Sequence, residues 1–177
     1  MQTYITRLTE LFEENRNSEQ AVPMQNYMKN HFAFLGIRTP LRNELQKQFF
    51  QETGLLKEPF KHELILGLWD KSEREYQYAA LAYIEKSLKK LQKHDFVLME
   101  KLITMKSWWD TVDVIAPKPV GRIAQDFPEV IADRIEEWTS HEDMWLRRAA
   151  ILFQLKYKRK TDESLLYKNI LKNSNSK

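Results

Sequence analysis

Helix-start signals recur at a nearly constant spacing along this sequence, and the spacing limits the possible folds more than any other feature. A Ser or Thr that can cap a helix, followed by a Pro or an acid in the first turn, stands at four positions: Thr39, Ser72, Ser107 and Ser140. These positions are separated by 33, 35 and 33 residues. A second set of starts falls between them, near Glu58, Asp95, residues 126–127 and Thr161. One helix pair about every 35 residues is typical of an α-solenoid.

The apolar residues repeat with a helical period as well. After Tyr4, Leu8 and Phe12 return to the same helix face, and residues 64–69 repeat the pattern. The 4 Gly and 6 Pro of the chain are too few for the many tight turns of a β-sandwich. We therefore expect an all-α fold, a right-handed α-solenoid of about five helix pairs with a concave basic face. An irregular bundle of helices of ordinary length would give a similar spacing, and the sequence alone leaves that alternative open.

The boundaries of the array follow from the same patterns. No low-complexity linker interrupts it, so we expect a single repeat domain over residues 1–172. The polar residues 173–177 are expected to fray. At one internal start, Ser72 heads the segment SERE, and Glu75 three residues later predicts a capping box.

Composition and motifs exclude several classes of site. The chain has no Cys, which excludes disulfides, thiolate metal ligands and a Cys nucleophile. The four histidines lack the spacing of a metal site, and no Gly-rich phosphate loop is present, so we expect neither metal nor cofactor. No apolar run is long enough to cross a membrane, and no signal peptide is evident. A cytoplasmic protein is the expectation.

Basic charge gathers toward the C-terminus, although the formal net charge is only +3. Residues 140–177 hold nine Lys and Arg against four acids, which gives +5 for this segment and −2 for residues 1–139. Such a distribution suits a polyanionic partner. A solvated, lysine-rich surface is the alternative interpretation.

The segment SWWDTVDVIAPKP carries the first candidate chemistry. On a helix that starts near Ser107, Trp109 and Asp113 fall at i and i+4 and share one face. An indole attracts a cation and a carboxylate stabilises developing positive charge, so the pair suits a cationic ligand. Alternatively, both tryptophans of the segment belong to the core and Asp113 pairs with a lysine. Pro117 and Pro119 are expected to end or kink the helix.

A second group of candidate functional residues lies in the segment SHEDMWLRRAAILFQLKYKRK. Arg148 and Lys156 are eight residues apart and are predicted to share a helix face, with Lys158, Arg159 and Lys160 just beyond. Arg binds phosphate through paired hydrogen bonds, so this row predicts contact with a nucleic-acid backbone. A solvated helix face that ends in cations is an equally good interpretation. The apolar stripe of this helix is predicted at residues 144, 151, 152 and 155.

Three motifs together resemble one known family, the AlkD-like DNA alkylation repair glycosylases. The motifs are MKNHFAFLGIRTPLR at residues 28–42, SWWDTVDVIA at 107–116 and MWLRRAAILFQLKYK at 144–158. Their order and spacing agree with the family from residue 1 to about residue 170. The resemblance implies an α-solenoid of HEAT-like repeats, in agreement with the period of the helix starts.

The resemblance also implies an activity. It predicts a monofunctional DNA glycosylase that excises cationic N3- and N7-alkylated purines, such as 3-methyladenine and 7-methylguanine, from double-stranded DNA without flipping the base into a pocket. By position, Asp113 matches the catalytic aspartate and Trp109 the tryptophan beside it, while Arg148 matches a DNA-contacting arginine. Tyr27 matches a further aromatic residue of the concave surface. Lys156, Lys158 and Arg159 are expected to contact DNA as well. A monomer is expected, located at the bacterial nucleoid when it is bound to DNA.

One departure from the family pattern concerns the C-terminal end. Family members usually continue with another helical unit, which supplies a second tryptophan to the lesion site. Here the last of the five tryptophans is Trp145, and we expect a C-terminally short member of the family. The alternative function is therefore a catalytically weakened or inactive DNA-binding protein. A HEAT-like protein–protein adaptor without a DNA role is a third possibility.

Overall fold

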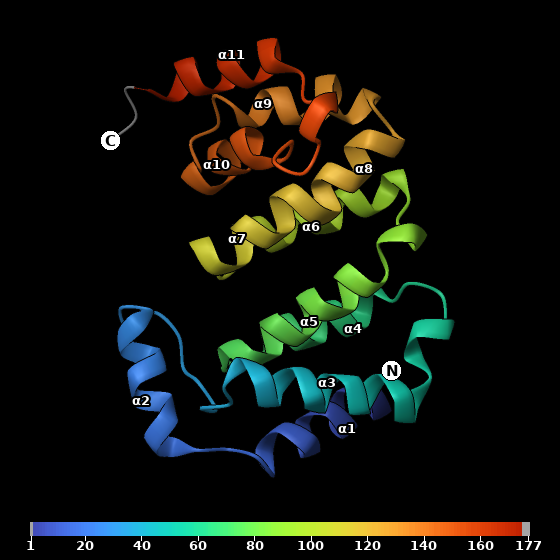
Figure 1. Cartoon of the computed structure of the whole chain (residues 1–177), viewed down its shortest axis with the longest axis vertical. Helices are drawn as coiled ribbons and strands as arrows, with labels where there is room; N and C mark the ends of the chain where they lie inside the picture. The colour runs from blue at the N-terminus through green and yellow to red at the C-terminus, as the bar shows by residue number, and fades with distance from the viewer. Residues whose placement is uncertain (1, 175–177) are drawn as a thin grey trace. The chain divides into compact units, whose positions relative to one another are not determined.

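The computed structural model describes residues 2–174, and this part of the chain is helical without a strand. The predicted all-α class is confirmed. The chain divides into two compact units, Met1–Ser87 and Leu88–Lys177, and each is described by itself (Figure 1). In the described part, no helix is both long and apolar enough to cross a membrane.

The first unit is built on five α-helices and one 3-10 turn: α1 (Gln2–Glu13), α2 (Ser18–Tyr27), α3 (Thr39–Thr53), η1 (Leu55–Lys57), α4 (His62–Asp70) and α5 (Arg74–Lys86). Helix α1 packs against α3 and α4, and α5 packs against α3 and α4 (Figure 1). The contact faces are apolar, with Phe12, Leu64, Trp69 and Ile84 buried between the helices. The hydrophobic effect therefore holds these helices together.

The second unit contains the remaining elements: η2 (Leu88–Lys90), η3 (Lys93–Asp95), α6 (Phe96–Thr104), α7 (Trp109–Ile115), η4 (Ala116–Val120), α8 (Gly121–Asp126), η5 (Ile131–Ile135), α9 (Glu136–Trp138), α10 (Met144–Leu152), η6 (Lys158–Lys160) and α11 (Glu163–Asn173). Helix α10 packs against α6, α7, α9 and α11 (Figure 1). Helices α7 and α8 are joined by the π-helical turn η4, which contains Pro117 and Pro119. Proline lacks the amide hydrogen that a regular helix uses, so the two prolines interrupt the α-helix at η4, as the sequence predicted.

The predicted repeat of helix starts is confirmed and is more regular than the sequence signals indicated. Helices α3, α5, α7 and α10 begin at Thr39, Arg74, Trp109 and Met144, each 35 residues after the one before. The capping residues are different ones, however. Asp143, not Ser140, caps α10 by accepting a hydrogen bond from the backbone N–H of Trp145 at 2.7 Å. Ser107 donates to the carbonyl of Ile103 at 2.6 Å instead of capping α7.

The predicted capping box at Ser72 is wrong, and the reason lies in another part of the first unit. Helix α5 begins only at Arg74, and the Glu75 side chain is completely buried. Its carboxylate accepts hydrogen bonds from the backbone N–H groups of Leu35, Gly36 and Ile37 at 3.0, 2.9 and 3.1 Å. Buried amide hydrogens without an acceptor destabilise a fold, so Glu75 satisfies this loop rather than its own helix.

The last described helix, α11, ends at Asn173. The Asn173 amide donates to the carbonyl oxygens of Thr139 and Asn169 at 3.0 and 2.9 Å, so the first residue of the predicted frayed tail is held in place. Residues 175–177 of that tail lie outside the described residues. The single domain over residues 1–172 stays a prediction.

Candidate DNA-contacting site

The site is built at the start of α7. Trp108 is extended, with φ −161° and ψ 162°, and the helix begins at Trp109. Thr111, Val112 and Ile115 are buried on one side of the helix. On the other side, the Trp109 residue is 40% exposed and the Asp113 side chain 34% exposed. The i, i+4 spacing places both on one accessible face, as the sequence predicted.

The alternative placement of both tryptophans in the core is wrong for Trp109 and holds in part for Trp108. The Trp108 ring is half-buried and lies against the ring of Trp145, with centroids 5.7 Å apart and planes tilted by 55°. Aromatic rings in contact bury a large apolar area. Trp108 therefore anchors the beginning of α7 against α10, which leaves Trp109 directed outward.

Asp113 pairs with Arg148, not with a lysine. Arg148 Nε and one terminal nitrogen donate to the two carboxylate oxygens of Asp113, both at 2.6 Å. The hydrogen bonds to Asp113 raise the pKa of the Arg148 guanidinium above its ordinary value. Both side chains remain partly accessible, at 34% for Asp113 and 43% for Arg148. The sequence predicted both residues, and the structure joins them in one two-pronged ion pair.

The repeat explains why these two side chains meet. Asp113 is the fifth residue of α7 and Arg148 the fifth residue of α10, so they occupy equivalent positions of consecutive repeats. Helices α7 and α10 pack against each other, and the pair spans 35 residues of sequence. The 35-residue period therefore carried a signal for this contact that opposite charges at i and i+35 could have revealed.

Lys156 does not share a helix face with Arg148, because α10 ends at Leu152. After the helix, the Gln154 side chain binds the backbone of Asp162. Its nitrogen donates to the Asp162 carbonyl at 3.2 Å and its oxygen accepts from the Asp162 N–H at 2.7 Å. Lys156 lies in the following turn, and Lys158 and Arg159 lie in η6. All three are exposed, and none forms an ion pair with another described residue.

The predicted apolar stripe of α10 is also wrong. Met144 and Leu155 are 54% and 63% exposed, whereas Leu146, Ala149 and Phe153 are buried. Met144 is the first residue of α10 and Leu155 lies beyond its end at Leu152, so the buried face of the helix is formed by Leu146 and Ala149 instead. Met144, the first residue of α10, is therefore an exposed apolar residue directly before Trp145 in the sequence.

The family model for DNA alkylation repair enzymes matches residues 8–177. The chain belongs to this family. A solved structure of a predicted DNA alkylation repair enzyme from Enterococcus faecalis is 30% identical to this chain, with a TM-score of 0.81. The match covers 92% of this chain and 76% of that one. None of the curated proteins matches. The family indicates a role in alkylation repair and implies DNA binding.

Tyr27 lies in the first unit, where it ends α2 and is 72% exposed. The sequence-based role for Tyr27 in DNA contact stays a prediction, as do the roles of the other candidate residues. Two residues escaped the sequence analysis. Tyr157 donates from its hydroxyl to the Gly121 carbonyl at 2.7 Å, and Arg147 donates to the carbonyls of His141 and Glu142 at 2.7 and 2.8 Å. Tyr157 thus joins the chain after α10 to α8, and Arg147 holds the segment before α10, contacts that periodicity does not reveal.

Proposed function

We propose that this protein is an AlkD-like DNA glycosylase that excises cationic N3- and N7-alkylated purines from double-stranded DNA. The observation that carries the proposal is the accessible Asp113 carboxylate, held in a two-pronged pair with Arg148 and placed one helical turn after the exposed Trp109. A fixed negative charge beside an indole face matches a reaction in which both substrate and transition state are positively charged.

The chemistry of the substrate accounts for the small number of catalytic groups. An alkylated purine carries a positive charge, so when the C1′–N bond breaks, the bonding electrons neutralise the departing base. The base therefore needs no proton from a general acid. The sugar becomes oxocarbenium-like, and the Asp113 carboxylate stabilises this charge. Water then bonds to C1′ and releases a proton, which leaves an abasic site.

Arg148 links DNA binding to that chemistry. In the free protein its guanidinium neutralises the Asp113 carboxylate. A DNA phosphate offers the guanidinium the same two-pronged geometry that the carboxylate does. Transfer of Arg148 from Asp113 to a phosphate would therefore leave the Asp113 charge uncompensated beside the sugar at the moment when it is needed. Lys156, Lys158, Arg159 and Tyr27 complete the proposed DNA contacts, with no cofactor or metal.

Release of 7-methylguanine from methylated duplex DNA by the purified protein tests the proposal. The expected result is release by the parental chain and loss of release in Asp113→Asn. Asp133→Asn is a matched control, because Asp133 is an exposed carboxylate of the same unit whose partner is Lys93. Binding of the duplex without release by the parental protein would instead support a DNA-binding protein without turnover. Absence of salt-dependent DNA binding would contradict both interpretations.

A further inference from the structure

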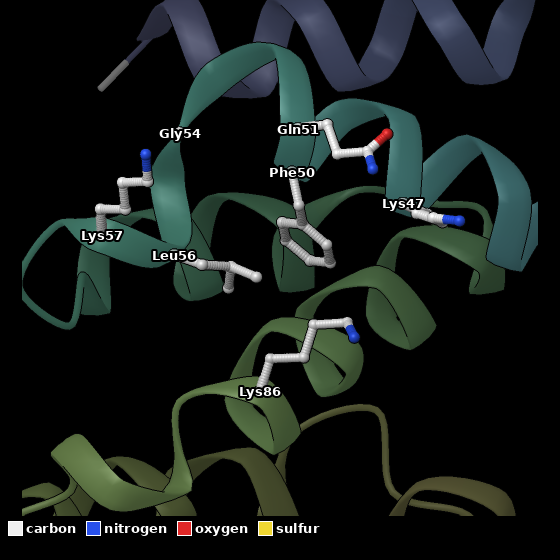
Figure 2. Close-up of a pocket in the computed structure, with 7 residues that line it drawn as sticks. All are labelled: Lys47, Phe50, Gln51, Gly54, Leu56, Lys57 and Lys86. Atoms are coloured by element: carbon white, nitrogen blue, oxygen red, sulfur yellow. The ribbon is translucent and has the colours of Figure 1, made fainter.

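A second candidate site lies in the first unit, away from the residues discussed so far. A pocket of about 410 Å³ opens between the C-terminal half of α3, the turn η1 and the end of α5, as Figure 2 shows. Three lysines and two apolar side chains contribute most of its lining: Lys47, Lys57, Lys86, Phe50 and Leu56. The volume falls within the range of about 300–1,000 Å³ that is usual for small-ligand pockets.

The floor of the pocket is apolar. Phe50 is only 7% exposed, and its ring lies against the rings of Phe49 and Tyr83 at 5.6 and 6.4 Å between centroids. Leu56 is half-buried beside it. Gly54 borders the opening in the left-handed conformation, with φ +63°, and no atom lies within 4 Å of the position where its Cβ would stand. The space beside Gly54 is therefore open, and the floor offers mainly apolar surface.

The rim carries positive charge without compensation. Lys47, Lys57 and Lys86 are exposed, and none of them forms an ion pair within residues 2–174. Two arginines of the unit differ in this respect, because Arg7 pairs with Glu52 and Arg16 with Glu13. Cations near helix ends are common because they favour the helix dipole, and this accounts for Lys57 and Lys86. The helix dipole does not account for Lys47, which lies in the middle of α3.

We infer that this pocket binds an acidic peptide segment of a partner protein, with one large apolar side chain seated on Phe50 and Leu56 and acids paired with the three lysines. Interface hot spots commonly have this form, an apolar anchor in a pocket with a charged rim that steers the partner. Duplex DNA fits less well, because its phosphates would contact the lysines and leave the apolar floor unused.

The test uses the full chain and a short synthetic peptide in which a single Phe is flanked by aspartates, followed by fluorescence anisotropy. The parental protein should bind this peptide and should bind the same peptide with Ala in place of Phe at least about tenfold more weakly. The double variant Lys57→Gln/Lys86→Gln should weaken binding roughly fivefold or more. Lys89→Gln removes an exposed lysine that does not line the pocket, and it should leave binding unchanged.

A second pair of variants addresses the floor. Leu56→Met keeps an apolar side chain of similar volume and should bind the peptide normally, whereas Leu56→Asp should abolish binding. Thermal melting of each variant separates loss of the pocket from loss of the fold. The inference is wrong if the parental chain does not bind the peptide, if the lysine variants bind it normally, or if they lower duplex affinity alone. Excision of 7-methylguanine should be unchanged in the lysine variants, so this test and that of the proposed function can fail separately.

Discussion

Asp113 and Arg148 hold each other through two hydrogen bonds of 2.6 Å across a gap of 35 residues in the sequence. Each is the fifth residue of its helix, so the bond connects the same position in two consecutive repeats. In the free protein the pair neutralises both charges. Anything that binds one partner therefore changes the electrostatic field of the other.

The first prediction concerns Asp113→Asn. The variant keeps the shape of the side chain and removes its charge, so single-turnover excision of 7-methylguanine should fall by a factor of roughly 10² or more. Binding to undamaged duplex should hold or tighten, because Arg148 is then freer to contact phosphate and a negative charge has been removed. Rapid-quench kinetics and anisotropy measure the two effects. Excision at the parental rate would rule out this carboxylate as the stabilising group.

The second prediction concerns Arg148→Ala. Loss of one phosphate contact should weaken binding to all duplexes alike and make the plot of log K against log salt shallower by about one unit. Arg122→Ala is the control, because Arg122 is an exposed arginine of the same unit paired with Asp126. Titrations over a range of salt concentrations compare the two. An unchanged salt slope in Arg148→Ala would show that this guanidinium does not contact the backbone.

The sequence predicted the helical class and the repeat, because apolar periodicity and capping residues depend on neighbouring positions. It named Asp113 and Arg148 separately, from their spacing to neighbouring residues and from the family resemblance, and it did not predict that they pair. The sequence predicted the capping residues less accurately, because Ser and Asp are both favoured as helix caps and can stand close together. At α10 Asp143 caps and Ser140 does not, so the helix begins at Met144, four residues after Ser140. The end of α10 depends on Gln154 and Asp162, and no local pattern indicates that contact.

Glu75 is a clearer example of a contact that the local sequence does not indicate. Locally, its sequence predicts a capping residue, but its partners are three amide groups about 40 residues earlier in the chain. Only the packing of the loop 35–37 against α5 brings them together. Similarly, the pocket at Lys47, Phe50 and Lys86 joins residues of α3 and α5, and no local pattern indicates that these side chains border one cavity.

The third prediction follows from this buried carboxylate. Glu75→Ala removes the acceptor of three backbone hydrogen bonds and should lower the free energy of unfolding by about 3 kcal/mol or more. Glu75→Gln keeps one acceptor oxygen and should cost less. Urea denaturation followed by circular dichroism gives both values. Glu44→Ala, at an exposed position of α3, is the control and should remain near the parental value.

The fourth prediction concerns acid sensitivity. Hydrogen bonds from Arg16 lower the pKa of Glu13 below its ordinary value of 4.5, with a further hydrogen bond from the Tyr76 hydroxyl. A carboxylate with a lowered folded pKa stabilises the fold above its unfolded pKa, and this contribution disappears as the pH falls through the folded pKa. Stability should therefore decline below pH 4.5. Glu13→Gln should be less stable at neutral pH and lose less of its stability on acidification, as measured by urea denaturation at each pH.

The last prediction concerns the close approach of α8 to the chain after α10. A Cβ atom added to Gly121 would stand 2.4 Å from the carbonyl oxygen of Phe153 and 3.4 Å from the Tyr157 ring. Because the first neighbour is backbone, one segment must move, and Gly121→Ala should cost about 1–3 kcal/mol of unfolding free energy. Tyr157→Phe removes only the hydrogen bond from the hydroxyl to the Gly121 carbonyl and should cost about 1 kcal/mol. Chemical denaturation measures both costs. Since this contact braces the end of α10 and not Arg148 directly, Tyr157→Phe should keep the parental salt slope of DNA binding. A changed slope would show that the position of Arg148 depends on this brace.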